Sequence, residues 1–432
     1  MNGLFTNEKA VHYDSSRQKK LYFTLLKGHY HGVEPVSQID RYEIRELLGE
    51  GAMSKIFSAW DPKLHREVAL KKIDSNVILS EKNLDRFQRE VRAIAALKHP
   101  NIVEIYDYSD INAEHYYLVM ERLDGDDLFN IMHENSAMPE PIVAAIGHEL
   151  CLALKVAHQK GVIHRDIKPE NVMLTQSGRV VLTDFGVVKA VREDSAVTGW
   201  RESTDVIGTV GFMAPELILK QDLQPGTDIF ALGALLYNVA TLQMPYPGEN
   251  AIAVFEAVQA GNYRPVQETQ PNLSQGFCEL LKQSLDGDPK NRLANIDEVL
   301  AQLKDLLKNN GVNDLRDDLR DYINNPQGYE KMHRQRLIDH LLRGIKLAIK
   351  DKNVSLAEQL QGQLLDIDPF NQALTQITGL HLREEFNELD DTRPSRNVAQ
   401  ENNTDGGIGI VPLSMAIVLG ILLAFGAYIL LL

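Results

Sequence analysis

The stretch HRDIKPEN, from His164 to Asn171, places charged and amide side chains between two apolar segments. GVI precedes it and VML follows it, and both read as parts of a buried framework. Charged side chains are rarely buried without a partner. The stretch is therefore either a solvated turn or a place where a charged group is handled.

A second polar motif, TDFG, follows at Thr183 to Gly186. Asp184 in this motif and Asn171 in the first carry oxygen atoms of the kind that Mg²⁺ prefers as ligands. Asp166 offers a carboxylate that can accept a hydroxyl proton. A DFG turn alone is common, so each motif by itself stays compatible with an ordinary turn.

The segment before these motifs predicts a sheet. Residues 41–73 alternate apolar and polar side chains, with breaks at the glycines of LGEGAMSKI and at DPK, and this pattern indicates three antiparallel strands. Gly49 and Gly51 would let backbone N–H groups approach phosphate oxygens, although an ordinary hairpin explains them equally well. Two more strands are expected in IVEIYDYSD and HYYLVMERL.

Two charged residues stand out in this first part of the chain. Lys71 ends the apolar strand VALK, where a lysine is usually a solvated edge residue. Glu90 lies beside the apolar stripe of the helix predicted in 80–99, for which Ser80 is the candidate N-cap. If Lys71 and Glu90 meet, the pair would direct an ammonium group at a phosphate.

Later segments are helical. PIVAAIGHELCLALKVAHQKG and DIFALGALLYNVATL are long and apolar, and the second is apolar nearly all round, which predicts a central position in a large core. A strand-rich part followed by a helix-rich part gives an α+β, two-lobed fold.

The order of the motifs resembles the eukaryotic-type, or Hanks-type, protein kinases over about residues 42–308, in their bacterial membrane-anchored form. Glycine turn, strand lysine, helix glutamate, HRDxKxxN, DFG and APE (Ala214–Glu216) each occur once and in one sequence order. This resemblance implies ATP and Mg²⁺ as cofactors and proteins as substrates. It implies that Asp166 is the catalytic base, that Lys168 steadies the transferred phosphoryl group, that Lys71 binds the α/β-phosphates and pairs with Glu90, and that Asn171 and Asp184 hold magnesium.

The resemblance also implies a nucleotide site. Met120 resembles the gatekeeper residue, and Ser54 stands where the family has a third glycine. The implied nucleotide-binding residues are Leu48, Gly49, Glu50, Gly51, Ala52, Met53, Ser54, Lys55, Ile56, Ala69, Lys71, Glu121 and Leu123.

Three structural roles are implied in the same way. Asp228 would anchor the catalytic loop, and Glu216 would pair with Arg292. An internal stack aligning the two lobes would consist of Ile94, Ile105, His164 and Phe185.

Lys168 and Thr209 resemble the serine/threonine-specific class, so protein Ser or Thr hydroxyls are the expected targets. Arg165 would read a phosphate on the segment between DFG and APE. The candidate autophosphorylation residues are Ser203 and Thr204, with Ser195 and Thr198 behind them, while Asp205 raises the alternative of a built-in negative charge.

Net charge and composition limit the partners. The formal net charge of −15 argues against a nucleic-acid surface, since binding a polyanion needs clustered Lys and Arg. Val411 to Leu432 has no charged residue, and 22 residues at about 1.5 Å each span a bilayer core. We therefore expect a membrane protein with a single-pass C-terminal anchor and its kinase domain in the cytoplasm.

Five regions follow from these patterns. Within the last of them, Ala416, Gly420 and Ala424 share a spacing that would let two membrane helices pair as a homodimer, although small residues are frequent in such helices anyway. The regions are an N-terminal extension (1–41), a kinase domain (42–308), a helical, tetratricopeptide-like region (309–389), a flexible linker (390–407) and a transmembrane helix (408–432).

Two other functions stay open at this point. A non-catalytic kinase-fold scaffold at the membrane would bind without turning over ATP, although Lys71, Asp166, Asn171 and Asp184 are all present. A small-molecule or lipid kinase would lack the peptide groove that APE and Thr209 indicate.

Overall fold

The structure is a computed structural model of the chain. It describes residues 38–51, 53–74, 81–110, 113–134, 136–186, 210–248 and 251–377. The described residues up to Pro369 belong to one compact unit, and those from Phe370 belong to a second.

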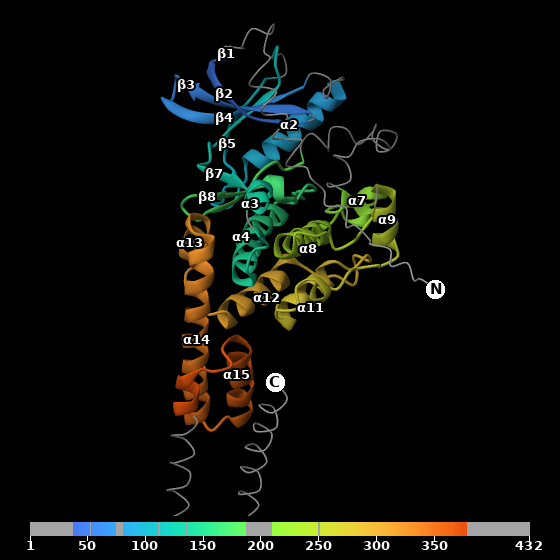
Figure 1. Ribbon diagram of the computed structural model, residues 1–432. Coiled ribbons are helices and arrows are strands. Elements are labelled where there is room, and N and C mark those ends of the chain that lie inside the picture. The colour runs from blue at the N-terminus through green and yellow to red at the C-terminus, as the bar shows by residue number, and fades with distance from the viewer. Residues whose placement is uncertain are drawn as a thin grey trace, which may run out of the picture. The chain divides into compact units, whose positions relative to one another are not determined.

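Among the described residues, a six-stranded sheet and helix α2 make up the first lobe (Figure 1). The three strands predicted in 41–73 form as an antiparallel set, and the two predicted after the helix also form. Helix α2, Glu81–Ala95, turns an apolar face toward the core, with Phe87 and Val91 fully buried. The strands are β1 (Gln38–Ile39), β2 (Tyr42–Gly51), β3 (Ser54–Asp61), β4 (Arg66–Ile73), β5 (Ile105–Tyr108) and β6 (Tyr117–Met120), in the order β1-β2-β3-β4-β6-β5.

The second lobe is built on two core helices. Helix α4 (Glu140–Gln159) begins after Pro139, and α8 (Pro225–Thr241) is buried on nearly every side, as its uniformly apolar sequence predicts. Among the described residues, α4 is the one helix long and apolar enough to cross a membrane, but 67% of that stretch is buried inside the protein. Helix α4 is therefore a core helix. Together, the strand-rich first lobe and the helical second lobe confirm the two-lobed α+β architecture expected from the sequence.

A small sheet lies in the second lobe beside these helices, with its three strands in the order β7-β8-β9. Its strands are β7 (Gly125–Asp127), β8 (Val172–Thr175) and β9 (Val180–Leu182), and HRDIKPEN directly precedes β8 while TDFG directly follows β9. The other helices among the described residues of this lobe are α3 (Leu128–Glu134), the 3₁₀ turn η2 (Pro169–Asn171), α7 (Pro215–Ile218), α9 (Ala251–Gln259), α10 (Val266–Thr269), α11 (Gln275–Ser284) and α12 (Ile296–Asn309).

Three further helices follow α12 within the first compact unit. They are α13 (Leu315–Asn324), α14 (Pro326–Lys350) and α15 (Val354–Ile367). Asp314 and Asn353 cap α13 and α15 by accepting hydrogen bonds from backbone N–H groups of the first turn. Helix α13 packs against α4 as well as against α14, so this helical region adds to the kinase-like fold instead of standing apart from it.

The two cysteines lie in the second lobe. Cys151 on α4 and Cys278 on α11 are both buried and form no disulfide. Burial raises the pKa of each thiol, most strongly for Cys151. Both cysteines are therefore packing residues and not reactive thiols in the folded chain.

Candidate active site

The HRDIKPEN stretch forms a loop held from below by helix α8. Asp228 in the first turn of α8 is fully buried, and its carboxylate accepts hydrogen bonds from the backbone N–H groups of His164 (2.9 Å) and Arg165 (3.0 Å). The ring of His158 adds a third contact to Asp228 at 2.8 Å. Arg165 takes a left-handed backbone with φ of 67°, a conformation that a non-glycine residue keeps only when its surroundings hold it. Asp228 therefore has the anchoring position expected from the sequence.

Asp166 and Asn171 meet at the open end of this loop. The side-chain amide of Asn171 donates to the backbone oxygen of Asp166 at 2.7 Å and to its carboxylate at 3.0 Å. Because the amide nitrogen makes both of these bonds, the side-chain oxygen of Asn171 remains to act as a ligand for a cation. Lys168 places its ammonium 3.9 Å from the same carboxylate of Asp166.

Asp184 joins the first lobe to this loop. Its carboxylate lies 2.7 Å from the ammonium of Lys71 on β4, and both side chains are largely shielded from solvent. Asp184 also has a left-handed backbone, with φ of 53°. The neighbouring Thr183 donates to the backbone oxygen of Asn171 from its N–H at 2.9 Å and from its hydroxyl at 3.1 Å, so Lys71, Asp166, Asn171 and Asp184 are brought to one region.

The ion pair expected between Lys71 and Glu90 is not formed in this structure. Lys71 pairs with Asp184, and Glu90 on α2 instead lies 3.8 Å from the guanidinium of Arg165. The physical reason is competition: each charged group has an opposite charge nearer than the partner predicted for it. The sequence placed Glu90 on the correct helix face but could not determine which cation it contacts.

The glycine turn lies near Lys71 in the sheet. Gly49 of β2 pairs in register with Ile56 of β3, and Ile56 pairs with Lys71 of β4. A Cβ atom added at Gly49 would meet nothing within 4 Å, and one at Gly51 would meet only the backbone oxygen of Ser54 at 3.8 Å. Packing therefore does not explain why glycine stands at either position. Open backbone at this place is what close approach of a phosphate group requires.

An apolar cluster lies between the glycine turn and the small sheet. Of the predicted nucleotide-binding residues it contains Ala69, with Ile56 and Leu123 packed against it, and the gatekeeper candidate Met120. Two members, Val103 and Val181, were not predicted from the sequence, and neither was Met173, which packs against the cluster. Met173 lies between the buried Val172 and Leu174 on β8, so strand alternation could have found it.

The connection between the lobes begins at Met120, the last residue of β6. The backbone N–H of Glu121 donates to Glu104 at 2.9 Å, and no hydrogen bond within the described residues uses the carbonyl of Glu121 or the N–H of Leu123. Those two backbone groups are the ones that remain for an adenine edge. The side chain of Glu121 is held by Arg179, which was not singled out from the sequence.

The expected internal stack is present in part at the centre of the molecule. The rings of His164 and Phe185 are 4.4 Å apart, and both residues are buried; Phe185 belongs to the cluster that also contains Ile94, with Ile105 packed against it. Burial lowers the pKa of His164, and the ring is held as one neutral tautomer: its Nε2–H donates to the backbone oxygen of Thr183 at 2.9 Å, and its Nδ1 accepts from the backbone N–H of Asp166 at 3.2 Å. The stack therefore joins helix α2 to the catalytic loop.

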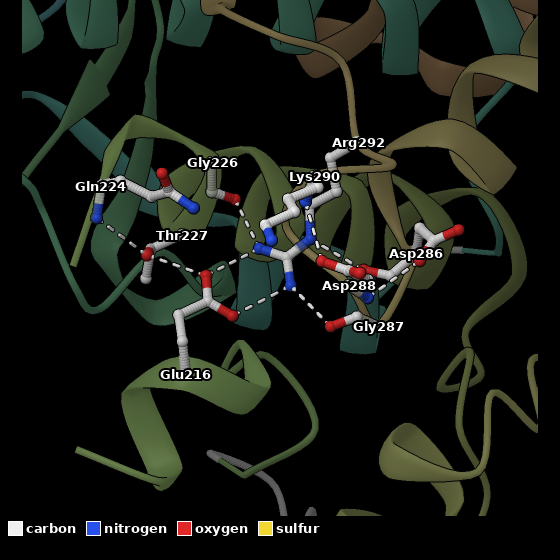
Figure 2. Close-up of polar contacts among 9 residues, drawn as sticks. All are labelled: Glu216, Gln224, Gly226, Thr227, Asp286, Gly287, Asp288, Lys290 and Arg292. Carbon is white, nitrogen blue, oxygen red and sulfur yellow. Dashed lines mark hydrogen bonds and ion pairs between the residues drawn. The ribbon is translucent and has the colours of Figure 1, made fainter. Parts of the chain in front are cut away.

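A buried ion pair stabilises the segment after the site. Figure 2 shows Glu216 of the APE motif and Arg292 facing each other through two hydrogen bonds of 2.7 and 2.9 Å. Thr227 donates to the same carboxylate at 2.9 Å, and Arg292 also donates to the backbone oxygen of Gly226 at 2.9 Å. The pair expected from the sequence is confirmed.

Several predicted residues lie outside the described part of the chain. They are Ser80, Ala52, Ser195, Thr198, Ser203, Thr204, Asp205, Thr209 and the predicted transmembrane helix. Within the described part, no group of three or more His, Cys, Asp and Glu side chains could hold a metal ion. A cation between Asn171 and Asp184 would therefore need oxygen atoms from a bound phosphate as well.

Comparison with known proteins gives a consistent result. The family described as the protein kinase domain matches residues 42–303. The serine/threonine-protein kinase PknB of Mycobacterium leprae is 33% identical over 268 residues, which is 61% of this chain and 42% of that protein. A probable serine/threonine-protein kinase of Clostridium perfringens is 33% identical over 276 residues, which is 63% of this chain and 39% of that protein.

The chain thus spans about two fifths of the length of these curated relatives. Among solved structures, the kinase domain of PknI from Mycobacterium tuberculosis aligns with a TM-score of 0.51 at 23% identity, over 64% of this chain and 99% of that domain. This second comparison bears on the fold alone. From the residues that converge at the site and from the match over residues 42–303, the chain belongs to the protein kinase domain family.

Proposed function

We propose that this chain is a serine/threonine protein kinase, which transfers the γ-phosphoryl group of ATP to a protein hydroxyl. The observation that carries the proposal is the convergence of Lys71, Asp166, Asn171 and Asp184 on one region, fixed by buried Asp228. The serine/threonine class is supported by Lys168 and by the similarity to kinases named as serine/threonine-specific.

The residues present fit ATP and magnesium. Lys71 and the open backbone at Gly49 and Gly51 would hold phosphates, and the free oxygen of Asn171 with the carboxylate of Asp184 would hold the metal. Bound Mg²⁺ would neutralise the phosphate charge that grows during transfer. The adenine would lie on the apolar cluster around Ala69 and Met120, against the unused backbone groups of Glu121 and Leu123.

Within the site, Asp166 has the position to orient the attacking hydroxyl and accept its proton. Lys168, 3.9 Å from that carboxylate, would stabilise charge on the phosphoryl oxygens. Glu90 would act by orienting Lys71, which requires it to leave Arg165, so its role depends on a movement of α2.

The experiment is a Mg²⁺-dependent phosphotransfer assay on the full chain with ATP and a set of Ser/Thr and Tyr peptides. Asp166→Asn should lower turnover by roughly a factor of 10² or more, since it removes the proton acceptor. Asp305→Asn, the same change at an exposed position of α12, should keep wild-type turnover. ATP binding without any turnover in the wild type would favour the kinase-fold scaffold, and transfer to Tyr peptides alone would contradict the serine/threonine class.

We further propose that residues 411–432 anchor the chain in a membrane, on the side where cytoplasmic ATP is available. Support comes from their uncharged, apolar sequence. The full chain should remain with vesicles after alkaline carbonate washing, while a variant lacking 408–432 should not. Equal release of both would contradict the anchor and leave the kinase assay unaffected.

Autophosphorylation on Ser203 or Thr204 and pairing through Gly420 belong to the same proposal. Mass spectrometry of active protein should find phosphate on one of the first two residues. A Gly420→Ile variant should self-associate less in membranes.

A further inference from the structure

The turn between β8 and β9 contacts two parts of the protein. One is the connection between the lobes that follows Met120, called the hinge below, and the other is the helical region that follows the kinase domain. We propose that Arg179 on this turn is a positioning residue for the hinge that receives adenine, and that helix α13 holds the turn in place through Gly178. The helical region would thereby set the affinity for ATP. This inference rests on the proposed function, because it concerns the nucleotide site.

Arg179 forms a bidentate ion pair with the hinge residue Glu121. One nitrogen lies 2.5 Å from a carboxylate oxygen of Glu121, and another lies 3.0 Å from the second oxygen. The third nitrogen donates to the backbone oxygen of Pro100 at 2.5 Å. A planar guanidinium in such a two-pronged pair fixes direction as well as distance, which a lysine cannot do.

The hinge residue is therefore held at two points. The backbone N–H of Glu121 is bound to Glu104, and its side chain is bound to Arg179, so the free carbonyl of Glu121 has a defined direction. A second hydrogen bond links the same turn to the hinge, since the backbone N–H of Gln176 donates to the backbone oxygen of Asp124 at 2.9 Å. Moving the turn would consequently move the groups expected to face adenine.

Helix α13 covers the other side of the turn. A Cβ atom added at Gly178 would lie 2.2 Å from the backbone oxygen of Arg316 and 2.8 Å from the backbone nitrogen of Arg320. The backbone of α13 therefore packs directly on the glycine Cα, and Gly178 also has a φ of 77°. No larger residue fits there while α13 keeps its position.

Helix α13 is itself fixed by a buried polar contact. Asp318 on its inner face is 2% exposed, and its carboxylate is paired with Arg336 of α14 and accepts from the hydroxyl of Tyr329 at 3.4 Å. A continuous set of contacts thus runs from α14 through α13 and the β8–β9 turn to the hinge. The matched kinase domain ends at residue 303, so this support comes from residues beyond it.

The first test separates ATP affinity from turnover. Arg179→Ala should raise KM for ATP by roughly three- to tenfold, because the carbonyl of Glu121 loses its fixed direction, with kcat at saturating ATP changed less than about twofold. Arg179→Lys should recover only part of the loss, because it keeps the charge and not the fork. Glu121→Ala should match Arg179→Ala, and the double variant should be no worse than either single variant.

The second test addresses α13. Gly178→Ala should raise KM for ATP in the same direction, because the added Cβ displaces either the turn or the helix. Gly261→Ala is the matched control: its φ of 67° gives the same backbone strain, and its Cβ would meet nothing within 4 Å. It should keep the wild-type KM.

A readout that needs no catalysis keeps this inference separate from the proposed function. Hydrogen exchange of the hinge amides in the nucleotide-free full chain should be faster in Arg179→Ala and Gly178→Ala than in the wild type or Gly261→Ala. Unchanged exchange together with an unchanged KM would overturn the inference even in an active kinase. Faster exchange in a chain with no ATP turnover would uphold the positioning role of Arg179 and reject the kinase activity.

Discussion

Glu216 and Arg292 form a two-pronged ion pair although 76 residues separate them in the chain. Their side chains are 3% and 0% exposed, so both charges lie out of water and depend on protein partners: each other, the hydroxyl of Thr227 for Glu216, and the backbone oxygens of Gly226 and Asp286 for Arg292. Removing one partner would leave an uncompensated buried charge.

We therefore expect Arg292→Met to lower the free energy of unfolding by about 3–5 kcal/mol. Urea unfolding followed by circular dichroism measures this value. Arg320→Met is the matched control, because Arg320 pairs with Asp317 on the surface and should cost less than about 1 kcal/mol. Equal losses in the two variants would contradict a special role for the buried pair.

The same pair predicts acid sensitivity. Burial alone would raise the pKa of Glu216, but the hydrogen bonds and charge of Arg292 outweigh burial and hold that pKa below its ordinary value. A lowered pKa in the folded state stabilises the protein above the ordinary glutamate pKa of about 4.3, and this stabilisation is lost as pH falls through the folded value.

Wild-type stability should therefore fall more steeply than that of Glu216→Gln as the pH is lowered from 5 through the folded pKa of Glu216. Parallel urea titrations of the two proteins over this range check the difference. If the free energies of unfolding of the two proteins fell in parallel with pH, ionisation of Glu216 would not be a source of stability.

Asp228 connects the core of the second lobe to catalysis. In Asp228→Asn an amide group would face the backbone N–H groups of His164 and Arg165, which lose one charged acceptor. Because misplacing a catalytic group by about 1 Å can cost a factor near 10², we expect kcat to fall roughly 10- to 100-fold with little change in KM for ATP. Steady-state kinetics with ATP varied measures both constants, and a change confined to KM would count against the anchoring role.

The ion pair between Lys71 and Asp184 gives a fourth prediction. Lys71→Met should lower kcat/KM by about 10²–10³, since it removes a positive charge from the site where phosphate charge develops. Lys155→Met removes a lysine that is paired with Asp297 on the surface of the second lobe, and it should keep wild-type kinetics. Similar losses in both variants would point to a general effect of charge.

The motifs predicted most of the fold because each part of the sequence agrees with its surroundings. Strand alternation in 41–73 and the uniformly apolar stretch at 228–242 determine which faces are buried, and these faces leave few alternatives for packing. Asp228, buried at the start of α8, then places the catalytic loop. The two lobes could therefore be inferred from these patterns, while the convergence of the polar motifs was implied by their resemblance to the kinase family.

Partner choice among charged side chains could not be inferred in the same way. Lys71 has Asp184 and Glu90 as candidate partners, and the outcome depends on where α2 lies relative to β4, a distance that no local pattern encodes. Arg179 and Glu121 are 58 residues apart, and neither carries a sequence signal of the other. Contacts set by tertiary placement are the part that required the structure.

The two buried cysteines have a practical consequence for work on this chain. Cys151 is wholly enclosed in α4, and Cys278 is nearly so in α11, so neither sulfur can meet a water-soluble reagent while the helices stay packed. The rate at which such a reagent modifies the two thiols is then set by opening of the second lobe. Opening of that lobe can therefore be followed without attaching a label.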